Sequence, residues 1–355
     1  MPHCKFIYSG LTVDPNMEIR PCCHVQSNKD SYIKYNQFDF SVETNFPEMA
    51  ESMKTGWHPA CTECSNLEAI GDESPRTKAE ENYNDAPAGE YNLIDLKTSN
   101  TCNLTCVMCS PGFSSAWVQL LKKNPDIANN YSHLHFQPDE ILHWDLDEKI
   151  LDCIQNAELL KFTGGEPFLI KDVKKICKRL VDNNVDTSTI KLIFNTNGNV
   201  TLNNEWYDIL NSFDTEIHVS VDGVDRRYEY VRPGGSWSYL ESFIGGLAEN
   251  FYGNITIAAI SQALNYIQTD LLIDLPNRWK LKNGQSSVEE ILYNPYFLNN
   301  SSVNPQLREK YGFTSLHDWN PDNFEKMKTY LEKLDQVHNT DFITECPEFE
   351  GYNNV

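Results

Sequence analysis

Three cysteines lie close together near residue 100 and could bind a metal ion or a cluster. Cys102, Cys106 and Cys109 have the spacing C-x3-C-x2-C, just after an apolar run at 91–96 that predicts a strand. A structural zinc site takes four protein ligands, whereas a [4Fe–4S] cluster has four irons held by thiolates. Three local cysteines would therefore leave one iron for a non-protein ligand. The spacing by itself favours a catalytic cluster only slightly over a zinc site with a distant fourth ligand.

The first 64 residues hold a second set of cysteines, namely Cys4, Cys22, Cys61 and Cys64. The last two form a C-x2-C pair, a tight turn that suits thiolate ligation. Strands predicted at 6–8 and 17–20 would form a hairpin that brings the first two together. Cys23 competes with Cys22, because alternation along a strand turns only one of them inward. Four thiolates are compatible with zinc or a cluster, and a neighbouring histidine (His3, His24 or His58) could replace one of them.

Two glycines and a glutamate follow the next predicted strand. Gly164 and Gly165 leave the backbone bare enough to lie against a ligand. Carbonyl groups there could accept hydrogen bonds from an ammonium group, to which Glu166 would add negative charge. A plain strand-to-helix turn is the alternative. Further along, Ser220 and Arg232 offer a hydroxyl and a guanidinium that would suit a carboxylate.

From residue 91 onward, short β-rich runs alternate with helical periods. Strands are predicted at 91–97, 159–163, 190–195, 216–221, 255–260 and 290–293. Helices are predicted at 114–122, 146–154, 171–184, 206–213, 240–247 and 323–337. Repeated strand–helix units indicate an α/β fold with a parallel sheet, and such folds place their chemistry in loops after the strands. The cysteine triplet, Gly164–Pro167, Thr196–Gly198 and Asp222-Gly223 each follow a strand, which favours one shared site.

Two further cysteines are expected in the core. Cys153 and Cys177 fall on apolar faces of the helices at 146–154 and 171–184, where packing is favoured over ligation. The polar stretch at 65–90 is expected to link two parts of the chain, and 339–355 is expected to be an extended tail.

Composition limits the function classes. The formal charge of −22 over 355 residues opposes general nucleic-acid binding, which relies on clustered Lys and Arg. No apolar run is long enough for a membrane-spanning helix, and the N-terminus lacks a secretory pattern. We therefore expect a cytoplasmic protein with no membrane partner. Eleven cysteines in a reducing compartment are better explained by metal or cluster binding than by disulfides.

The cysteine triplet after one strand and Gly164–Pro167 after the next resemble the radical S-adenosylmethionine (radical SAM) superfamily, over about 90–300. The resemblance implies a partial (β/α)6 TIM-type barrel with a [4Fe–4S] cluster on the triplet. The open iron would chelate the amino and carboxylate groups of S-adenosylmethionine. Its reductive cleavage would give a 5′-deoxyadenosyl radical that abstracts hydrogen from a substrate.

The resemblance also implies roles for single residues. Gly164, Gly165 and Glu166 would meet the methionine amino group, while Ser220 and Arg232 would meet the carboxylate and ribose end. Asn197 would face cofactor or substrate. Met108 stands where the superfamily often has an aromatic residue, and it would shield the cluster or pack on adenine.

The N-terminal segment resembles the SPASM or twitch modules that carry an auxiliary [4Fe–4S] cluster, although those modules usually follow the barrel. This implies an auxiliary module at 1–85, a radical SAM barrel at 86–340 and a tail at 341–355. The second cluster would lie on Cys4, Cys22, Cys61 and Cys64, with zinc as the alternative.

The function expected from this resemblance is oxidation, cross-linking or epimerisation of a peptide or protein. A small molecule such as a sugar or alcohol is an alternative substrate. Cleavage would need a one-electron reductant such as flavodoxin or ferredoxin. The alternative from another class is a zinc-stabilised binding or scaffold protein without catalysis.

Overall fold

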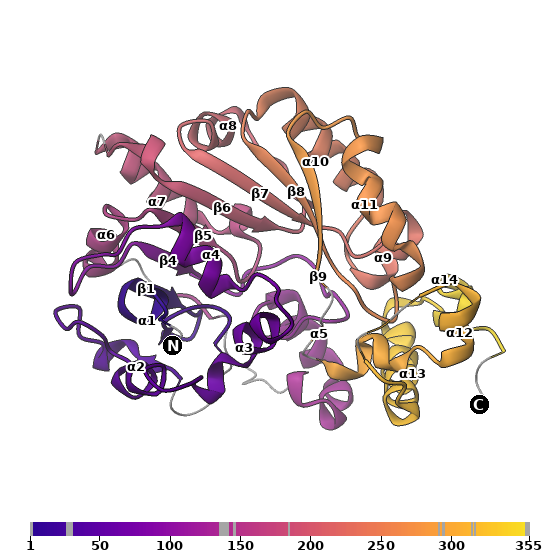
Figure 1. The fold of residues 1–355 in the computed structure, drawn as a ribbon. Helices are drawn as coiled ribbons and strands as arrows, with labels where there is room; N and C mark the ends of the chain where they lie inside the picture. The colour runs from indigo at the N-terminus through magenta and orange to yellow at the C-terminus, as the bar shows by residue number, and fades with distance from the viewer. Residues whose placement is uncertain are drawn as a thin grey trace. The chain divides into compact units, whose positions relative to one another are not determined.

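The structure is a computed structural model that describes residues 3–25, 31–134, 142–144, 147–183, 185–289, 292, 295–313, 315 and 317–351. Figure 1 shows the helices and strands of the chain, which divides into two compact units. Unit 1 comprises 1–100, 142–194 and 208–216, and unit 2 comprises 101–141, 195–207 and 217–355. None of the described helices is long and apolar enough to cross a bilayer.

The described strands form a mixed sheet in the order β3-β2-β1-β4-β5-β6-β7-β8-β9. Their bounds are β1 Gly10–Val13, β2 Glu18–Arg20, β3 Ile33–Lys34, β4 Leu93–Leu96, β5 Leu159–Phe162, β6 Lys191–Thr196, β7 Asp214–Ser220, β8 Asn254–Ile260 and β9 Gly284–Glu289. The β1–β4, β4–β5, β5–β6 and β8–β9 pairs are parallel, and β2 is antiparallel to both β1 and β3. The predicted α/β class is confirmed, while closure into a partial barrel stays a prediction.

In unit 1, apolar residues recur with the period of a helix or a strand, and these residues are buried where the helices pack against the sheet. The helices of this unit are α1 Phe6–Ser9, α2 Pro47–Ser52, α3 Thr62–Ala69, α4 Pro75–Asn82, α6 Glu148–Ile154 and α7 Lys171–Asp182. Alternation along β5 buries Leu160 and Phe162. On α7 the buried residues recur at helical spacing and include Cys177, whose predicted core position is confirmed. Cys153 is partly exposed, so its predicted core position holds only in part.

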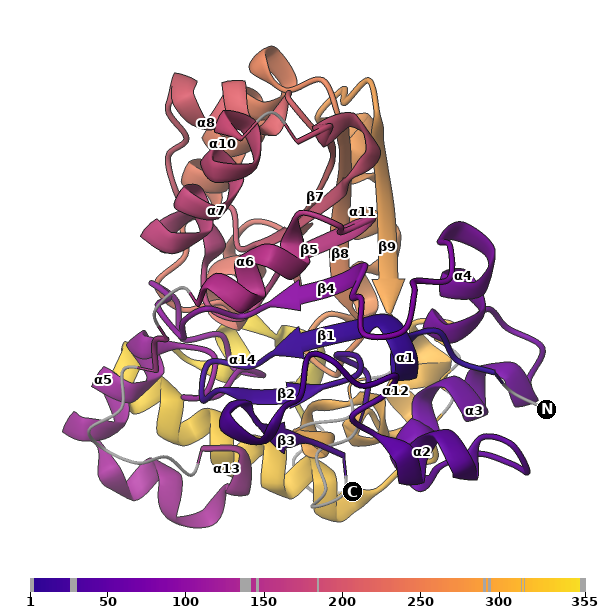
Figure 2. The same cartoon turned by 90° about the vertical axis from the view of Figure 1, so that its left-hand side faces the viewer.

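Unit 2 contains a second core. Its helices are α5 Ser115–Lys123, α9 Arg226–Val231, α10 Trp237–Asn250, α11 Thr269–Arg278, α12 Pro305–Lys310, α13 Pro321–His338 and α14 Phe342–Glu345. Helix α8 (Asn204–Leu210) has residues in both units. Helices α5 and α13, both labelled in Figures 1 and 2, contribute to this core, and Trp117 of α5 belongs to the same buried cluster as Tyr330 of α13.

Three predictions about elements need correction. Residues 6–8 belong to α1, not to a strand, because the chain makes a helical turn before β1. The stretch at 65–90 contains α4, whose N-terminus is closed by a capping box between Ser74 and Thr77. The segment at 339–355 is not an extended tail, since it contains α14 and buries Cys346 and Phe349.

Two other predictions remain open. The strand predicted at 290–293 falls mostly outside the described residues, and β9 ends at Glu289 instead. The domain boundaries predicted at 85/86 and 340/341 stay predictions, although β1 joins the sheet by pairing with β4.

Candidate functional site

The cysteine triplet lies in unit 2, in an irregular loop between Thr101 and α5. Backbone hydrogen bonds fix the loop against the segment at 231–233: the Thr105 amide donates to the Pro233 carbonyl at 2.9 Å, and the Val107 amide donates to the Val231 carbonyl at 3.0 Å. The Trp117 indole donates to the Cys106 carbonyl at 3.0 Å. The Tyr330 hydroxyl donates to the Val107 carbonyl at 2.9 Å. Trp117 and Tyr330, two aromatic residues of the unit 2 core, therefore hold the backbone that presents the thiols.

The three thiols of the triplet lie near one another and are largely withdrawn from water. Burial raises the pKa of the Cys106 thiol to about 12, with a smaller upward effect from Cys102. Burial also raises the pKa of Cys109, and both other thiols act on it in the same direction. Thiols must lose their protons to bind iron, so this arrangement is stable as thiolates only when positive charge or a metal compensates.

Two side chains place N–H groups beside these sulfurs. Nη1 of Arg232 lies 3.6 Å from Sγ of Cys106, and Nδ2 of Asn197 lies 3.7 Å from Sγ of Cys102. The guanidinium is held by Asp222, whose Oδ2 accepts from Nε at 3.0 Å and from Nη2 at 2.5 Å. The arginine and the asparagine, both predicted to contact cofactor or substrate, thus already contact the cysteines.

An asparagine network positions the start of the cysteine loop. Asn197 donates to Oδ1 of Asn103 at 2.8 Å, and Asn103 donates to the Asn199 carbonyl at 2.9 Å. Asn199 in turn donates to the Tyr228 hydroxyl at 2.6 Å. Gly198 lies at φ +68, a conformation that glycine adopts without strain. The Thr196–Gly198 motif is therefore a turn that braces the cysteine loop.

The residues around the triplet fit an anionic cluster. Within the described ranges, no group of three or more His, Cys, Asp or Glu is arranged to hold a metal ion. A [4Fe–4S] cluster carries its thiolates on separate irons, so its ligands need not converge on one point. One buried and two partly buried thiols, with a guanidinium and an amide beside two of the three, match the needs of an anionic cluster.

The Gly-Gly-Glu-Pro loop lies in unit 1, directly after β5. Gly164 has φ +97, and a Cβ there would lie 3.0 Å from Cβ of Lys97, so this position requires glycine. The Gly165 amide donates to the Ser99 carbonyl at 3.2 Å. Glu166 is fully buried, and its carboxylate accepts from the Phe168 amide at 3.2 Å. The predicted unusual backbone is confirmed at Gly164, whereas the predicted contacts of this loop with the cofactor stay predictions.

Two other predicted cofactor residues lie in unit 2. Ser220 ends β7 and is partly exposed. Met108 is partly buried and packs on the apolar core of that unit. Their roles toward the cofactor also stay predictions.

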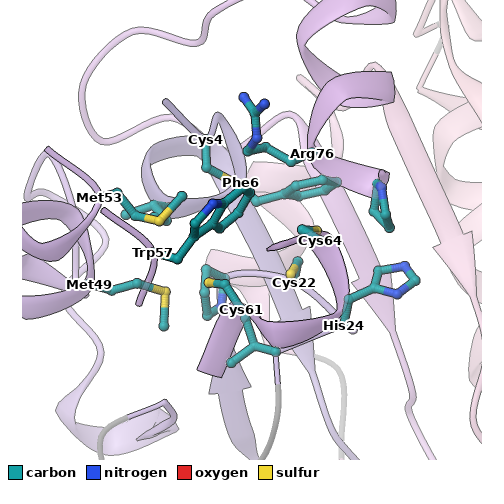
Figure 3. Close-up of a pocket in the computed structure, with 14 residues that line it drawn as sticks. Cys4, Phe6, Cys22, His24, Met49, Met53, Trp57, Cys61, Cys64 and Arg76 are labelled. Carbon is teal, nitrogen blue, oxygen red and sulfur yellow. The ribbon is translucent and has the colours of Figure 1, made fainter. Parts of the chain in front are cut away.

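The N-terminal cysteines form a separate pocket within unit 1. The N-terminal pocket is lined by Cys4, Cys22, Cys61 and Cys64 together with apolar side chains that include Phe6, Met49, Met53 and Trp57 (Figure 3). Burial raises the pKa of Cys4 to about 12 and that of Cys61 to about 11, and in both cases other cysteines of the pocket contribute. The structure therefore brings together the four cysteines that the sequence analysis groups.

Cys22 rather than Cys23 faces this pocket. Burial raises the pKa of the Cys23 thiol, but His24 and Lys161 outweigh it, so the net shift is downward. Nδ1 of His24 also lies 2.7 Å from Oε1 of Glu63. Cys22 and Cys23 therefore lie in different surroundings, and Cys23 lies in a charged environment of its own.

The histidines that could replace a ligand are arranged differently from one another. Of the three, only His24 lines the N-terminal pocket. His58 accepts from the Ala60 amide at 3.2 Å and caps a short helix, while His3 lies 3.1 Å from Glu80.

Sequence reasoning did not assign a role to several residues of the site. Asp222, Asn103, Asn199 and Tyr228 were not among the predicted contacts. Asp222 follows β7 in the Ser-Val-Asp-Gly sequence at 220–223, so its position at a strand end was a usable signal. The other three are recognisable only from the hydrogen bonds that the fold creates.

This chain is similar to one protein-family model and to several curated proteins. The model of the Radical SAM superfamily matches residues 96–260. GTP 3′,8-cyclase of Clostridium botulinum is 25% identical over 152 residues, which are 41% of this chain and 40% of that protein. GTP 3′,8-cyclase of Campylobacter jejuni subsp. doylei is 25% identical over 211 residues, 58% of each chain. The chain therefore spans about half the length of the curated relatives it matches.

Solved structures match at lower sequence identity. The structure of native anSMEcpe with bound AdoMet covers 57% of this chain and 55% of that chain, at 17% identity and a TM-score of 0.41. The segment matched by the family model contains the cysteine triplet, Gly164–Pro167 and Arg232. Residues 96–260 of this chain are therefore similar to the radical SAM superfamily, as the cysteine triplet and Gly164–Pro167 indicate.

Proposed function

We propose that this protein is a radical SAM enzyme that binds a [4Fe–4S] cluster through Cys102, Cys106 and Cys109. The observation that carries the proposal is the set of three electrostatically interacting thiols, with Cys106 buried and with Arg232 and Asn197 beside two of the sulfurs. When bound and reduced, the cluster with S-adenosylmethionine would supply a 5′-deoxyadenosyl radical that abstracts hydrogen from a substrate.

The residues of the chain would hold and orient these groups. Gly164, Gly165 and Glu166 would receive the methionine amino group, and Ser220 with the remaining N–H groups of Arg232 would receive the carboxylate and ribose end. Support for this loop as a ligand-binding segment comes from the left-handed backbone of Gly164, at φ +97. We propose Met108 and Asn197 as further contacts, and a partial (β/α)6 barrel as the scaffold.

We further propose a second [4Fe–4S] cluster in the N-terminal pocket, on Cys4, Cys22, Cys61 and Cys64, within a SPASM- or twitch-like module at 1–85. Buried positive charge supports an anionic occupant. Burial lowers the pKa of Arg20, but Asp14 and the thiols of Cys23 and Cys22 outweigh it, so the guanidinium stays charged beside them. Zinc on the same four cysteines is the alternative.

The proposed setting is a reducing cytoplasm, with flavodoxin or ferredoxin as the electron donor. All eleven cysteines are thiols, which suits such a compartment. We propose a peptide or protein as the substrate, to be oxidised, cross-linked or epimerised with help from the auxiliary cluster. Neither a nucleic acid nor a membrane is proposed as a partner.

A small-molecule substrate is the second candidate. The observation that favours it is the name of the matched relatives, which are GTP 3′,8-cyclases. Incubating the reduced enzyme with S-adenosylmethionine and GTP, and searching for a new nucleotide product by mass spectrometry, tests this candidate directly. No change in GTP beyond a control without enzyme would exclude it.

The proposed radical SAM activity has its own test. Anaerobically reconstituted protein should release 5′-deoxyadenosine from S-adenosylmethionine only when dithionite is present. Cys106→Ala should abolish this release, whereas Cys177→Ala, a change in the core of unit 1, should not. Equal release from the wild type and Cys106→Ala would contradict the proposal. Zinc as the only bound metal would support a binding or scaffold protein instead.

A further inference from the structure

Arg232 occupies an unusual position for a residue expected to bind a carboxylate. Three of its N–H groups are engaged within unit 2: two donate to Oδ2 of Asp222, and Nη1 points to Sγ of Cys106 at 3.6 Å. This nitrogen–sulfur distance is normal for an N–H···S hydrogen bond. The guanidinium is therefore directed at one cysteine of the triplet.

Asp222 is itself fixed so that it can hold Arg232. Its side chain is about 1% exposed, and its Oδ1 accepts from the Ile260 amide at 2.8 Å. The Asp222 carbonyl also accepts from Nδ2 of Asn265 at 3.2 Å. A carboxylate anchored by β8 and the loop after it can hold the guanidinium in one orientation, since the planar fork has little freedom once two of its N–H groups are engaged.

A buried ion pair is a poor way to gain stability. Removing two charges from water is costly, and an apolar pair of similar volume is often equally stable. The side chains of Arg232 and Asp222 are 11% and 1% exposed, so their pairing needs another reason. The direction of the third N–H group toward Cys106 supplies one.

We propose that Arg232, oriented by Asp222, is a positioning residue that donates to the Cys106 sulfur and raises the reduction potential of the cluster on the triplet. This inference rests on the proposed radical SAM function. Hydrogen bonds to the ligand sulfurs and nearby positive charge stabilise the reduced cluster, which carries one more negative charge than the oxidised cluster. Asn197 is a neutral donor to Cys102 and should also raise the reduction potential, but without the contribution of a positive charge.

The test compares three single variants by redox titration of the reconstituted full chain. The titrated signal is the electron paramagnetic resonance (EPR) signal that changes on addition of S-adenosylmethionine, which separates the triplet cluster from the auxiliary cluster. Arg232→Met should shift the midpoint potential to more negative values, because both charge and donor are lost. Arg232→Lys should shift it less, because it keeps the charge but loses the planar fork.

Arg226→Met is the matched control. It removes the same charge from the adjacent helix α9, where the Arg226 side chain is 76% exposed and pairs with Glu345. Its midpoint potential should equal that of the wild type. An unchanged midpoint potential in Arg232→Met would overturn the inference, and so would an equal shift in Arg226→Met.

A folding defect is the main complication, since Arg232→Met leaves the Asp222 carboxylate buried and unpaired. The double variant Asp222→Asn/Arg232→Met removes both charges and avoids this penalty. It should fold with a circular dichroism spectrum like that of the wild type and still show the negative shift in midpoint potential. A wild-type potential in the folded double variant would contradict the inference.

The outcomes also separate this inference from the function on which it rests. If wild-type protein forms no cluster whose EPR signal responds to S-adenosylmethionine, the proposed function fails. If that cluster forms and Arg232→Met weakens S-adenosylmethionine binding at an unchanged midpoint potential, the proposed function stands. In that case Arg232 is a cofactor ligand only, and the inference is wrong.

Discussion

At the residue scale, two adjacent cysteines have different surroundings. Cys22 lines the N-terminal pocket with three other cysteines, whereas the thiol of Cys23 interacts with His24, Lys161 and Asp95. Both residues follow the end of β2, in a turn that directs the two thiols into different surroundings. The proposed ligation therefore depends on which side each thiol faces.

Substitution of these two cysteines should separate their roles. Wild-type protein reconstituted under anaerobic conditions should bind about eight irons, four for each of two clusters. Cys22→Ser should reduce the content to about four, because the N-terminal pocket loses a ligand. Cys23→Ser, the matched control, should keep the wild-type content. Iron and sulfide analysis measures both, and a loss in Cys23→Ser equal to that in Cys22→Ser would contradict this assignment.

Residue spacing predicted the cysteine triplet but not its surroundings. The C-x3-C-x2-C spacing is local, so the sequence alone identifies Cys102, Cys106 and Cys109. The pairing of Asp222 with Arg232 depends on how the end of β7 and the end of α9 meet, and the Asn103–Asn197 contact joins residues that are 94 positions apart. Contacts of this kind arise from the fold and leave no periodic signal in the sequence.

At the element scale, helices with a clear apolar period were predictable, and the four-residue helices α1 and α14 were not. Helices α7 and α13 show apolar residues at 3.6-residue spacing and were predicted within a few residues of their bounds. Helix α1 has only four residues, too few to show a period. Residues 342–349 are held by tertiary contacts, including the buried ion pair between Arg227 and Glu348. Tertiary contacts determine such segments, and the sequence pattern does not reveal them.

The C-terminal segment should contribute to stability. Phe349 is fully buried and packs against Phe324 and Phe342. Phe349→Ala should lower the free energy of unfolding by about 3–5 kcal/mol, because a large core side chain is lost and a cavity forms. Tyr252→Ala, which truncates an aromatic side chain that is 77% exposed, is the control and should change it little. Urea unfolding measures both, and equal losses would show that the segment is not part of the core.

Two glycines in unit 2 should respond in opposite ways to alanine. Gly198 lies at φ +68, and a Cβ there would lie 2.5 Å from Cδ1 of Leu240. Gly198→Ala should destabilise the protein by at least about 1 kcal/mol and loosen the turn that braces Asn103. Gly245 lies inside α10 with open space around its Cα, so Gly245→Ala should stabilise by about 0.5–1 kcal/mol. Thermal unfolding followed by circular dichroism measures the stability of both variants. A Gly245→Ala variant that is less stable than the wild type would contradict the open space at this position.

At the scale of the whole molecule, the chain carries two separate groups of thiols. The cysteine triplet belongs to unit 2, and the N-terminal pocket belongs to unit 1. Each group lies beside an arginine that is held by an aspartate: Arg232 with Asp222, and Arg20 with Asp14. The formal charge of −22 therefore does not describe the sites, since buried positive charge lies next to the thiols in both units. Net charge limits the class of partner and says little about the chemistry of a pocket.

The central claim is that the triplet holds a [4Fe–4S] cluster with one iron open to S-adenosylmethionine. Its most direct test is the EPR spectrum of the dithionite-reduced protein before and after addition of S-adenosylmethionine. The wild type should show a reduced [4Fe–4S] signal whose g-values change when the cofactor binds. Cys106→Ala should show no such change while keeping the signal of the N-terminal cluster. A wild-type spectrum that is identical with and without S-adenosylmethionine would contradict the claim.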